Sequence, residues 1–228
     1  MEQNREKSYR MGQLALGLVL MLLIISAAVV ITLNFRPLYY WEMDRMDLDQ
    51  VSGLSQEQIR RNYDVLIDYN NFWGPDTLEF PDLPMSEGGR IHFEEVKRVF
   101  LFFEYMVPVT LVLAVAGVAW FRRRRQFRYL KYAALLTVLV PLAAGLAIAV
   151  NWDQAFVLFH EVVFRNDLWI FNASTDPVIT ILPDTFFLHC AVMILVLVVL
   201  GSALCGAIYG RKSRGMAEKA ENQSKSVD

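Results

Sequence analysis

Apolar residues are gathered in four long blocks, and polar residues fill the segments between them. The blocks cover residues 11–33, 99–121, 130–150 and 186–209. A helix needs about 20 mostly apolar residues to cross the roughly 30 Å of hydrocarbon in a bilayer. Each block meets that length, so the pattern predicts four membrane-spanning helices. The first block is longer than the roughly 7–15 apolar residues of a signal-peptide core, so we expect a retained helix there.

The polar segment between the first two blocks, residues 34–98, predicts a small helical cap. Ser55 and Gln58 have the spacing of a capping box and precede apolar residues that repeat at helical intervals. This pattern predicts a helix over about 56–70. A loop rich in proline and glycine follows, and a helical pattern resumes near Arg90 and leads into the second block.

The segment between the third and fourth blocks, residues 151–185, contains an apolar run that is too short to cross a bilayer. The run covers residues 155–164, and Trp152 and Trp169 flank it. An apolar stretch of about ten residues is typical of an interfacial or re-entrant helix, and tryptophan is enriched at the boundary between lipid and water. We therefore expect this segment to lie at a membrane surface.

These elements predict an all-α membrane protein. Residues 1–210 form a single four-helix domain that includes the cap 34–98 and the interfacial segment 151–185. The polar tail, residues 211–228, has the composition of a disordered segment.

Basic residues predict the orientation of the four helices. Five arginines lie in the short loop 122–128, and three Lys or Arg residues lie within 211–214, whereas segments 34–98 and 151–185 hold eighteen acidic and eight basic residues. Loops rich in Lys and Arg stay in the cytoplasm. Both termini are therefore expected in the cytoplasm and the two acidic segments outside. The arginine run is explained by topology, so nucleic acid is not an expected partner.

The chain has three histidines, which are His92, His160 and His189. His92 precedes the second apolar block and His160 lies in the interfacial segment, so both are expected at the outer membrane surface. Imidazole takes up and releases a proton near neutral pH. Two imidazoles at one surface could therefore catalyse acyl transfer, although two interfacial histidines that only form local hydrogen bonds would give the same pattern. His189 is interpreted as a polar group at a helix end.

Nearby carboxylates could orient these rings. Asp153 or Asp167 could fix the tautomer of His160, and Glu95 lies about one helical turn from His92. Arg36, at the exit of the first span, could hold a lipid headgroup or stabilise an oxyanion. No oxyanion hole can be identified from the sequence.

Other chemistries have less support in the residues. The G-x-S-x-G and H-E-x-x-H motifs are absent, and Cys190 and Cys205 lie too far apart on one helix to form a disulfide. No cofactor or metal is expected, although His92, His160 and a carboxylate leave a three-ligand zinc site open. A charged residue inside a span is a functional candidate, so Glu104 with His189 keeps a transporter or proton relay open.

Two regions resemble the signature regions of a bacterial family of four-span integral membrane proteins. They are "LPMSEGGRIHFEEVKRVF" and "FHEVVFRNDLWIFNASTDPVITILPDTFF", with weaker similarity in "YYWEMDRM" and "IRRNYDVLIDYNNFW". The family includes the lipoprotein intramolecular transacylase, and the resemblance covers about residues 10–210. It implies that His92 and His160 are catalytic and that no cofactor is used.

The implied reaction moves the sn-2 acyl chain of a diacylglyceryl lipoprotein onto the α-amine of its own N-terminal cysteine, giving a lyso-form lipoprotein. The implied partners are this substrate and membrane lipid, and the implied location is the extracytoplasmic face of the bacterial cytoplasmic membrane. The flanking aspartates favour His160 as the base, with His92 aiding the oxyanion or the departing oxygen, and the sequence leaves the reverse assignment of the two histidines open. A non-catalytic membrane assembly or binding protein stays an alternative, and the sequence leaves the oligomeric state open.

Overall fold

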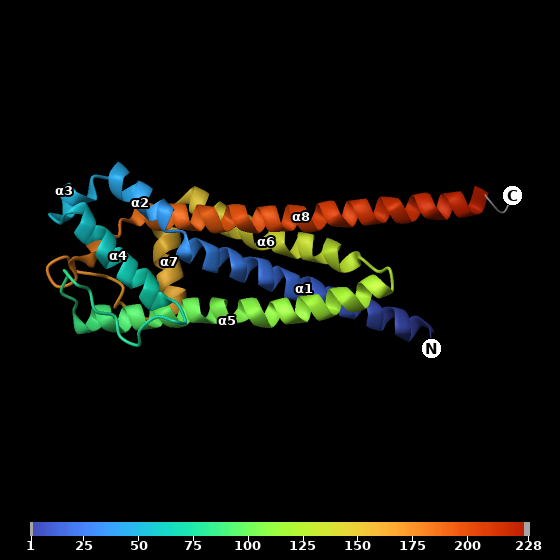
Figure 1. Ribbon diagram of the computed structural model, residues 1–228, viewed down its shortest axis with the longest axis horizontal. Helices are drawn as coiled ribbons and strands as arrows, with labels where there is room; N and C mark the ends of the chain where they lie inside the picture. Colours follow the sequence, from blue (N-terminus) through green and yellow to red (C-terminus); the bar gives the residue numbers. More distant parts are fainter. Residues whose placement is uncertain (1, 226–228) are drawn as a thin grey trace. The chain divides into compact units, whose positions relative to one another are not determined.

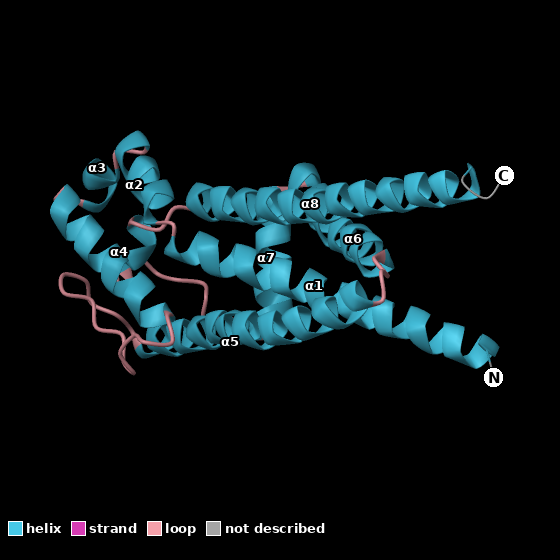
Figure 2. Cartoon of the chain, turned by 45° about the vertical axis from the view of Figure 1, so that its right-hand side comes forward, coloured by secondary structure: helices cyan, strands magenta, loops and turns pink. Residues whose placement is uncertain are grey.

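The computed structural model describes residues 2–225, and this part of the chain consists of helices joined by loops (Figure 1). In chain order the elements are α1 (Glu2–Asn34), α2 (Arg36–Arg45), α3 (Leu48–Ser52), α4 (Gln56–Asn70), α5 (Glu87–Arg123), α6 (Arg128–Val150), α7 (Trp152–Phe164), the 3₁₀ helix η1 (Pro177–Thr180) and α8 (Asp184–Lys225). Figure 2 shows helices and loops, and no strand, over residues 2–225. The predicted all-α class is confirmed.

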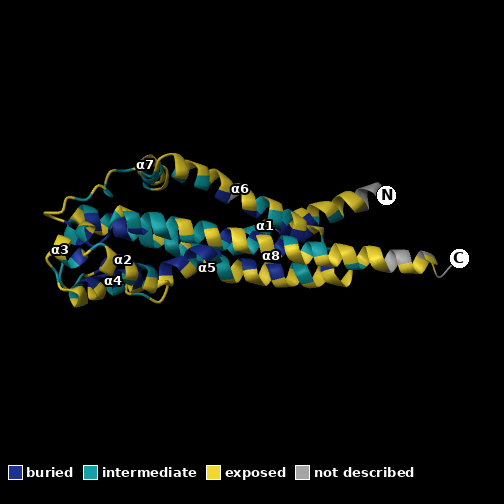
Figure 3. Ribbon diagram, turned by 90° about the horizontal axis from the view of Figure 1, so that it is seen from above, coloured by how far each residue is buried: buried dark blue, intermediate teal, exposed yellow. Residues whose placement is uncertain are grey.

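Four of the helices are long and apolar enough to cross a membrane. The qualifying stretches lie on α1, α5, α6 and α8, and they are Glu6–Asn34, Glu87–Arg123, Arg128–Val150 and Asp184–Glu218. Only 17% to 28% of the residues in their most apolar windows are buried, and Figure 3 shows long exposed stretches on these helices. So much exposed apolar surface is suited to lipid and not to water. The four spans predicted from the apolar blocks are confirmed.

The chain packs as two compact units, and each of the four long helices contributes residues to both. The first unit comprises α1 up to Ser26, residues 106–144 and α8 from Leu195 onward. The second unit comprises residues 27–105 and 145–194. Every predicted site residue belongs to the second unit.

Small residues let the helices of the first unit approach closely. A Cβ atom added to Gly17 would lie 2.7 Å from the Cβ of Tyr132, so α1 and α6 are in backbone contact at this level. The hydroxyl of Ser202 on α8 donates a hydrogen bond to the Ala134 carbonyl at 2.8 Å. Close approach at small residues and hydrogen bonds between helices are typical of helices that pack within lipid.

The second unit has a buried aromatic core that joins the short helices. The rings of Tyr39 on α2 and Tyr63 on α4 stack with 3.6 Å between their centroids. The Tyr39 hydroxyl donates a hydrogen bond to the carbonyl of Ile181, next to η1, at 2.7 Å. The predicted cap therefore folds around its own core, while its extracytoplasmic location stays a prediction.

Helix α4 begins and packs as its sequence pattern predicts. The Ser55 hydroxyl accepts a hydrogen bond from the Gln58 N–H, and the Gln58 side chain accepts one from the Ser55 N–H. This capping box satisfies backbone donors that the first helical turn leaves free. The residues of the predicted apolar face are all buried in the core: Ile59, Tyr63 and Ile67.

The tail differs from the prediction. The sequence predicts disorder after residue 210, but α8 continues to Lys225, and residues 226–228 lie outside the described part. Alanine, glutamate, lysine, arginine and methionine dominate this stretch, and all of them are strong helix formers. Continuation of an existing helix also needs no new nucleation step. Low hydrophobicity shows only that a segment buries few apolar side chains. In this chain such a segment is a polar extension of helix α8.

Candidate active site

His92 and His160 lie together in the second unit. His92 is on α5 and His160 is on α7, and their ring centroids are 6.1 Å apart with an angle of 32° between the ring planes. His92 is 5% exposed and His160 is 9% exposed. Two imidazoles that are 68 positions apart in the sequence therefore converge in one buried place, as the sequence predicts.

Aromatic rings surround both imidazoles. The rings within 5.5 Å of the His160 ring, measured between centroids, are Phe156 at 4.1 Å, Trp169 at 4.7 Å, Phe159 at 5.3 Å and Phe164 at 5.5 Å. Those closest to the His92 ring are Phe164 at 4.8 Å and Phe171 at 5.4 Å. Phe164 therefore contacts both imidazoles. An apolar surrounding of this kind disfavours a positive charge on either ring.

His160 is oriented by the backbone of its own helix. Its Nδ1 lies 2.7 Å from the carbonyl oxygen of Phe156. A carbonyl oxygen only accepts hydrogen bonds, so Nδ1 carries the proton and Nε2 keeps a lone pair. Burial lowers the pKa of His160 below its usual value of 6.5, and the hydrogen bond to Phe156 offsets only part of this effect. The ring is therefore neutral at pH 7 and can act as a base through Nε2.

Among the described residues, the hydrogen bond of the His160 ring is to this backbone carbonyl, and not to one of the predicted carboxylates. Asp153 and Asp167 are both exposed, and the Phe156 carbonyl takes the nitrogen that an orienting carboxylate would bind. Asp153 lies in the first turn of α7, so the near-two-turn spacing to His160 does not bring the two side chains together. A carbonyl four residues back in a helix is always within reach of a ring that turns toward it.

Glu95 has a different partner from the one predicted. The side-chain amide of Asn166 donates hydrogen bonds to both Glu95 oxygens, at 3.0 and 3.1 Å, and to the Phe164 carbonyl at 3.0 Å. Nδ1 of His92 is buried and has no hydrogen-bond partner among the described residues. Glu95 therefore joins the end of α7 to α5, one turn from His92. Sequence reasoning missed Asn166, for which the polar turn after α7 is the only signal.

Arg36 is engaged within the cap. Its guanidinium pairs with Asp64 at 2.7 Å and with Asp68 at 2.5 Å, both on α4. The Asp64 carboxylate also accepts a hydrogen bond from the Tyr40 hydroxyl at 2.7 Å. Two carboxylates already balance its charge, so the structure gives Arg36 a place in the packing of α2 on α4.

Two tryptophans of the second unit carry unsatisfied donors. The indole Nε1 atoms of Trp152 and Trp169 are both buried, and neither has a hydrogen-bond partner among the described residues. The Trp169 ring faces His160 at an angle of 33°, whereas the Trp152 ring lies 5.6 Å from Phe156. From the sequence both tryptophans were interpreted only as markers of the membrane boundary.

The third histidine is paired with a buried carboxylate, which sequence reasoning missed. Nδ1 of His189 lies 2.9 Å from a carboxylate oxygen of Glu42, which is completely buried. The other Glu42 oxygen accepts a hydrogen bond from the Thr185 hydroxyl at 3.1 Å. His189 is therefore more than a polar group at a helix end, because it is a hydrogen-bond partner of a carboxylate that has no access to water.

Glu104, the other member of the possible proton relay, is also buried. It is 7% exposed, and one of its oxygens accepts a hydrogen bond from the Phe72 N–H at 2.7 Å. It therefore does not extend to the surface. Glu104 and His189 have different partners, Phe72 and Glu42, so their recorded contacts do not join them into one chain of proton donors and acceptors.

The structure also tests whether the two histidines could belong to a metal site. Among them, no three His, Cys, Asp or Glu side chains lie together in a way that could hold a metal ion. His92 and His160 therefore have no third ligand in this arrangement.

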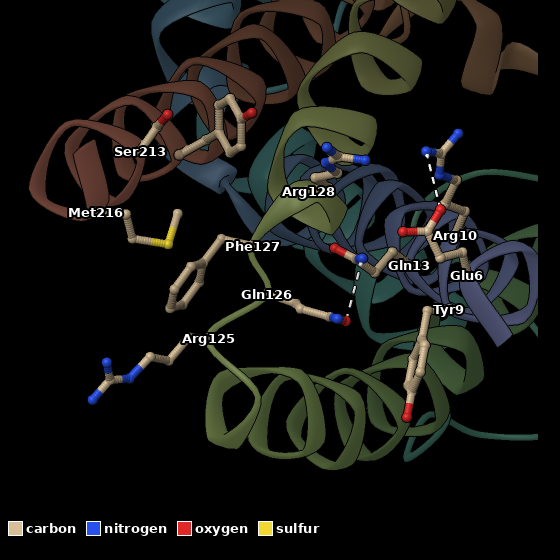
Figure 4. Close-up of a pocket in the computed structure, with 11 residues that line it drawn as sticks. Glu6, Tyr9, Arg10, Gln13, Arg125, Gln126, Phe127, Arg128, Ser213 and Met216 are labelled. Atoms are coloured by element: carbon tan, nitrogen blue, oxygen red, sulfur yellow. Dashed lines mark hydrogen bonds and ion pairs between the residues drawn. The ribbon is translucent and has the colours of Figure 1, made fainter. Parts of the chain in front are cut away.

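A hollow of the first unit has a different lining. It has a volume of about 460 Å³ and is lined mainly by α1 residues Tyr9, Arg10 and Gln13 and by residues 125–128. In Figure 4, Arg10 pairs with Glu6, and Gln13 bonds to Gln126. None of the predicted site residues lines it. We therefore place the candidate active site at the histidine pair, on the basis of its chemistry.

Comparisons with known proteins find matches in one family of membrane enzymes. Residues 14–187 match the family model described as lipoprotein intramolecular transacylase Lit. The structure of the membrane-integral lipoprotein intramolecular transacylase Lit from Bacillus cereus superimposes with a TM-score of 0.88 and 33% identity, over 92% of this chain and 97% of that chain. A variant of the same enzyme with one histidine replaced by arginine matches with a TM-score of 0.83 and 32% identity, over 95% of this chain and 99% of that one.

A match among curated proteins is an uncharacterised protein from Aquifex aeolicus. It is 36% identical over 96 residues, which is 42% of this chain and 43% of that protein. The matched stretch therefore spans less than half of that relative.

Proposed function

Because the chain belongs to the lipoprotein intramolecular transacylase family, whose members are membrane-integral acyltransferases, we propose that it moves the sn-2 acyl chain of a diacylglyceryl lipoprotein onto the α-amine of that lipoprotein's N-terminal cysteine. The observation that carries the proposal is the buried pair of imidazoles, 6.1 Å apart between ring centroids. The product is an N-acyl, S-monoacylglyceryl lipoprotein, which is the lyso form.

His160 acts as the base in this proposal. Its neutral ring keeps a lone pair on Nε2, and its lowered pKa preserves this form at neutral pH. An α-amine has a reference pKa of about 8, so part of it is already uncharged and the rest needs only modest help. The amine nitrogen attacks the ester carbonyl carbon while His160 removes a proton from that nitrogen.

His92 assists the departure of the glycerol oxygen. When the tetrahedral intermediate collapses, the bond between the carbonyl carbon and this oxygen breaks and the new amide remains. His92 donates a hydrogen bond to the oxygen, and the proton that His160 holds completes the hydroxyl. One proton leaves nitrogen and one proton reaches oxygen, so the reaction exchanges no net proton with water.

The surroundings of the pair favour transfer over hydrolysis. Both rings are buried among aromatic side chains, so little water reaches the reacting ester. The nucleophile and the acyl donor are parts of one molecule, and holding them together supplies a large effective concentration. Replacement of an ester by an amide is downhill, so the reaction needs no separate energy source.

The site belongs on the extracytoplasmic face in this proposal. The arginine-rich loop 122–128 and the basic residues after the fourth block indicate cytoplasmic ends. The cap and α7 then lie outside, where the acyl tails of a lipoprotein remain in the outer leaflet and its ester reaches the histidine pair.

Alanine substitution of each histidine tests the function. We expect His92→Ala and His160→Ala to give membrane-inserted protein that forms no lyso product. Substrate and product are isomers of equal mass, so tandem mass spectrometry of the lipoprotein's N-terminal peptide has to locate the acyl chain on nitrogen or on glycerol. His189→Gln is the matched control, since its amide can still donate to Glu42, and it should keep activity. Undiminished N-acylation in both alanine variants would overturn the proposal.

A further inference from the structure

The indole N–H of Trp169 is a hydrogen-bond donor without an acceptor in the described structure. Its Nε1 atom is buried away from solvent, although a tryptophan at a membrane boundary usually turns this group toward water or headgroups. A buried donor without a partner is unfavourable, and folded proteins leave few of them. A ligand bound next to such a donor would supply the missing acceptor, so the position of the donor decides whether it can serve the reaction.

The position of Trp169 relates this donor to the histidine pair. Its ring centroid lies 4.7 Å from that of His160. Two residues later, the ring of Phe171 lies 5.4 Å from that of His92, and the Phe171 N–H donates a hydrogen bond to the Trp169 carbonyl at 3.1 Å. One short stretch of chain therefore contacts both imidazoles and places an indole beside the base.

Acyl transfer needs a hydrogen-bond donor for the ester carbonyl oxygen, and both histidines have other tasks while the negative charge develops there. As the amine attacks, the π electrons of the ester carbonyl move to its oxygen, which becomes negatively charged. His160 is then occupied with the proton from the amine, and His92 faces the departing glycerol oxygen. A fixed neutral donor in a site that excludes water stabilises such an oxygen without taking part in proton transfer.

We propose that Nε1–H of Trp169 donates a hydrogen bond to the ester carbonyl oxygen and stabilises its negative charge in the tetrahedral intermediate; this rests on the function proposed above. The indole keeps its proton throughout. When the carbon–oxygen bond to glycerol breaks, the electrons return from the oxyanion to the carbonyl, and the hydrogen bond weakens to that of a neutral amide. Trp169 is thus a catalytic residue that touches a reacting atom.

Trp152 is the natural comparison. Its Nε1 is also buried without a partner among the described residues, but its ring packs on Phe156, at 5.6 Å, and stands outside the rings around His160 described above. Trp152→Phe removes an indole N–H from the second unit, as Trp169→Phe does. Trp169→Phe and Trp152→Phe therefore form a matched pair in which an aromatic ring is kept and only one donor belongs to the reaction.

The two phenylalanine variants give the first test, in the full-length enzyme with a synthetic diacylglyceryl lipopeptide. We expect Trp169→Phe to lower kcat by about 10²- to 10³-fold, the usual effect of losing one oxyanion donor, with KM and the pH profile of kcat unchanged. Trp152→Phe should keep the kcat of the unmodified enzyme. Equal losses in the two variants, or a Trp169→Phe loss that comes as a raised KM or a displaced pH profile, would assign Trp169 to packing against His160 and overturn the proposal.

A second variant separates the donor from the shape of the indole. Benzothienylalanine placed at position 169 by amber suppression has nearly the same outline but carries sulfur in place of N–H. It should show the same kcat loss as Trp169→Phe, with an unchanged melting temperature. Full kcat in this variant, while His160→Ala is inactive, would refute the role of Trp169 and leave the proposed function standing. Activity in both histidine-to-alanine variants would instead refute the proposed function.

Discussion

The side-chain amide of Asn166 donates hydrogen bonds to both carboxylate oxygens of Glu95, at 3.0 and 3.1 Å. This contact joins the turn after α7, which carries His160, to α5, which carries His92. The Asn166 side-chain oxygen also accepts a hydrogen bond from the Leu168 N–H at 3.0 Å, so the same residue shapes the start of the stretch that leads to Trp169. The Asn166 amide therefore links the segments that carry the two imidazoles, although its side chain is not among the aromatic rings around them.

Removal of this amide should weaken both the fold and the reaction. For Asn166→Ala we expect a loss of about 1 kcal/mol in unfolding free energy, the usual value for a hydrogen bond that is not fully buried, and a clear drop in kcat. Thermal unfolding in detergent and turnover of a lipopeptide measure the two effects. Asn172→Ala, an exposed asparagine whose side chain accepts only from Ser174, is the control. Identical behaviour of the two variants would show that Asn166 does not set the geometry of the pair.

The rate should fall in acid as His160 becomes protonated. The base must be neutral, and burial lowers the pKa of His160 below 6.5. Once the rate is divided by the uncharged fraction of the substrate α-amine, which itself titrates at about pH 8, we expect kcat to be maintained at pH 6.5 and to decline only at lower pH, with an apparent pKa below 6.5. A pH profile of kcat measures this, and His189→Gln should leave it unchanged. A corrected decline that is centred above pH 6.5 would contradict a buried, neutral base.

The same shift predicts how stability depends on pH. The pKa of His160 is lower in the folded state than in the unfolded state, so between these two values the unfolded chain binds more protons. Its contribution to stability is present above the unfolded pKa of about 6.5 and is lost as the pH falls toward the folded value. Melting temperatures measured downward from pH 7 should fall less steeply in His160→Gln than in the unmodified protein. Parallel curves would show that His160 is not buried as a neutral group.

Local patterns predicted much of the fold. The four apolar blocks, the capping box at Ser55 and Gln58, and the apolar face of α4 each depend on residues that are close in sequence, and the structure confirms all three. The convergence of His92 and His160 could be predicted because each histidine lies in a segment that ends near the same side of a span. Each of these features is determined by residues that are close together in the sequence.

The partners of the site residues could not be predicted in the same way. The Phe156 carbonyl orients His160, and a backbone acceptor leaves no mark in a sequence. Asn166 pairs with Glu95 over 71 positions, and His189 with Glu42 over 147. Several carboxylates and amides of similar type flank each histidine, so only the packed chain selects among them. The continuation of α8 to Lys225 could not be predicted for a related reason, since composition alone does not show that a helix is already there to extend.

The pair of Glu42 and His189 should act on stability rather than on chemistry. His189→Ala leaves a completely buried carboxylate without the imidazole that bonds to it, and a buried acceptor that loses its partner typically costs about 1–3 kcal/mol. Glu42→Gln should be milder, because a neutral amide needs less compensation. Melting temperature in detergent ranks the variants, and kcat per folded molecule should be the same in both. Loss of kcat with unchanged melting temperature would favour a proton relay instead.

Close packing in the first unit should be sensitive to a single methyl group. In Gly17→Ala the new Cβ would lie 2.7 Å from the Cβ of Tyr132 and 3.1 Å from the backbone nitrogen of Ala133. These atoms cannot swing aside as the end of a flexible side chain does, so α1 and α6 must separate. We expect a loss of about 1–3 kcal/mol, as in other overpacked cores, which lowers the melting temperature. The control is Gly206→Ala, where the nearest atom to a new Cβ is the Ala134 Cβ at 3.9 Å. Alanine has the higher helix propensity, so this change should be neutral or stabilising, and equal melting temperatures for the two variants would mean that α1 and α6 are not in backbone contact at Gly17.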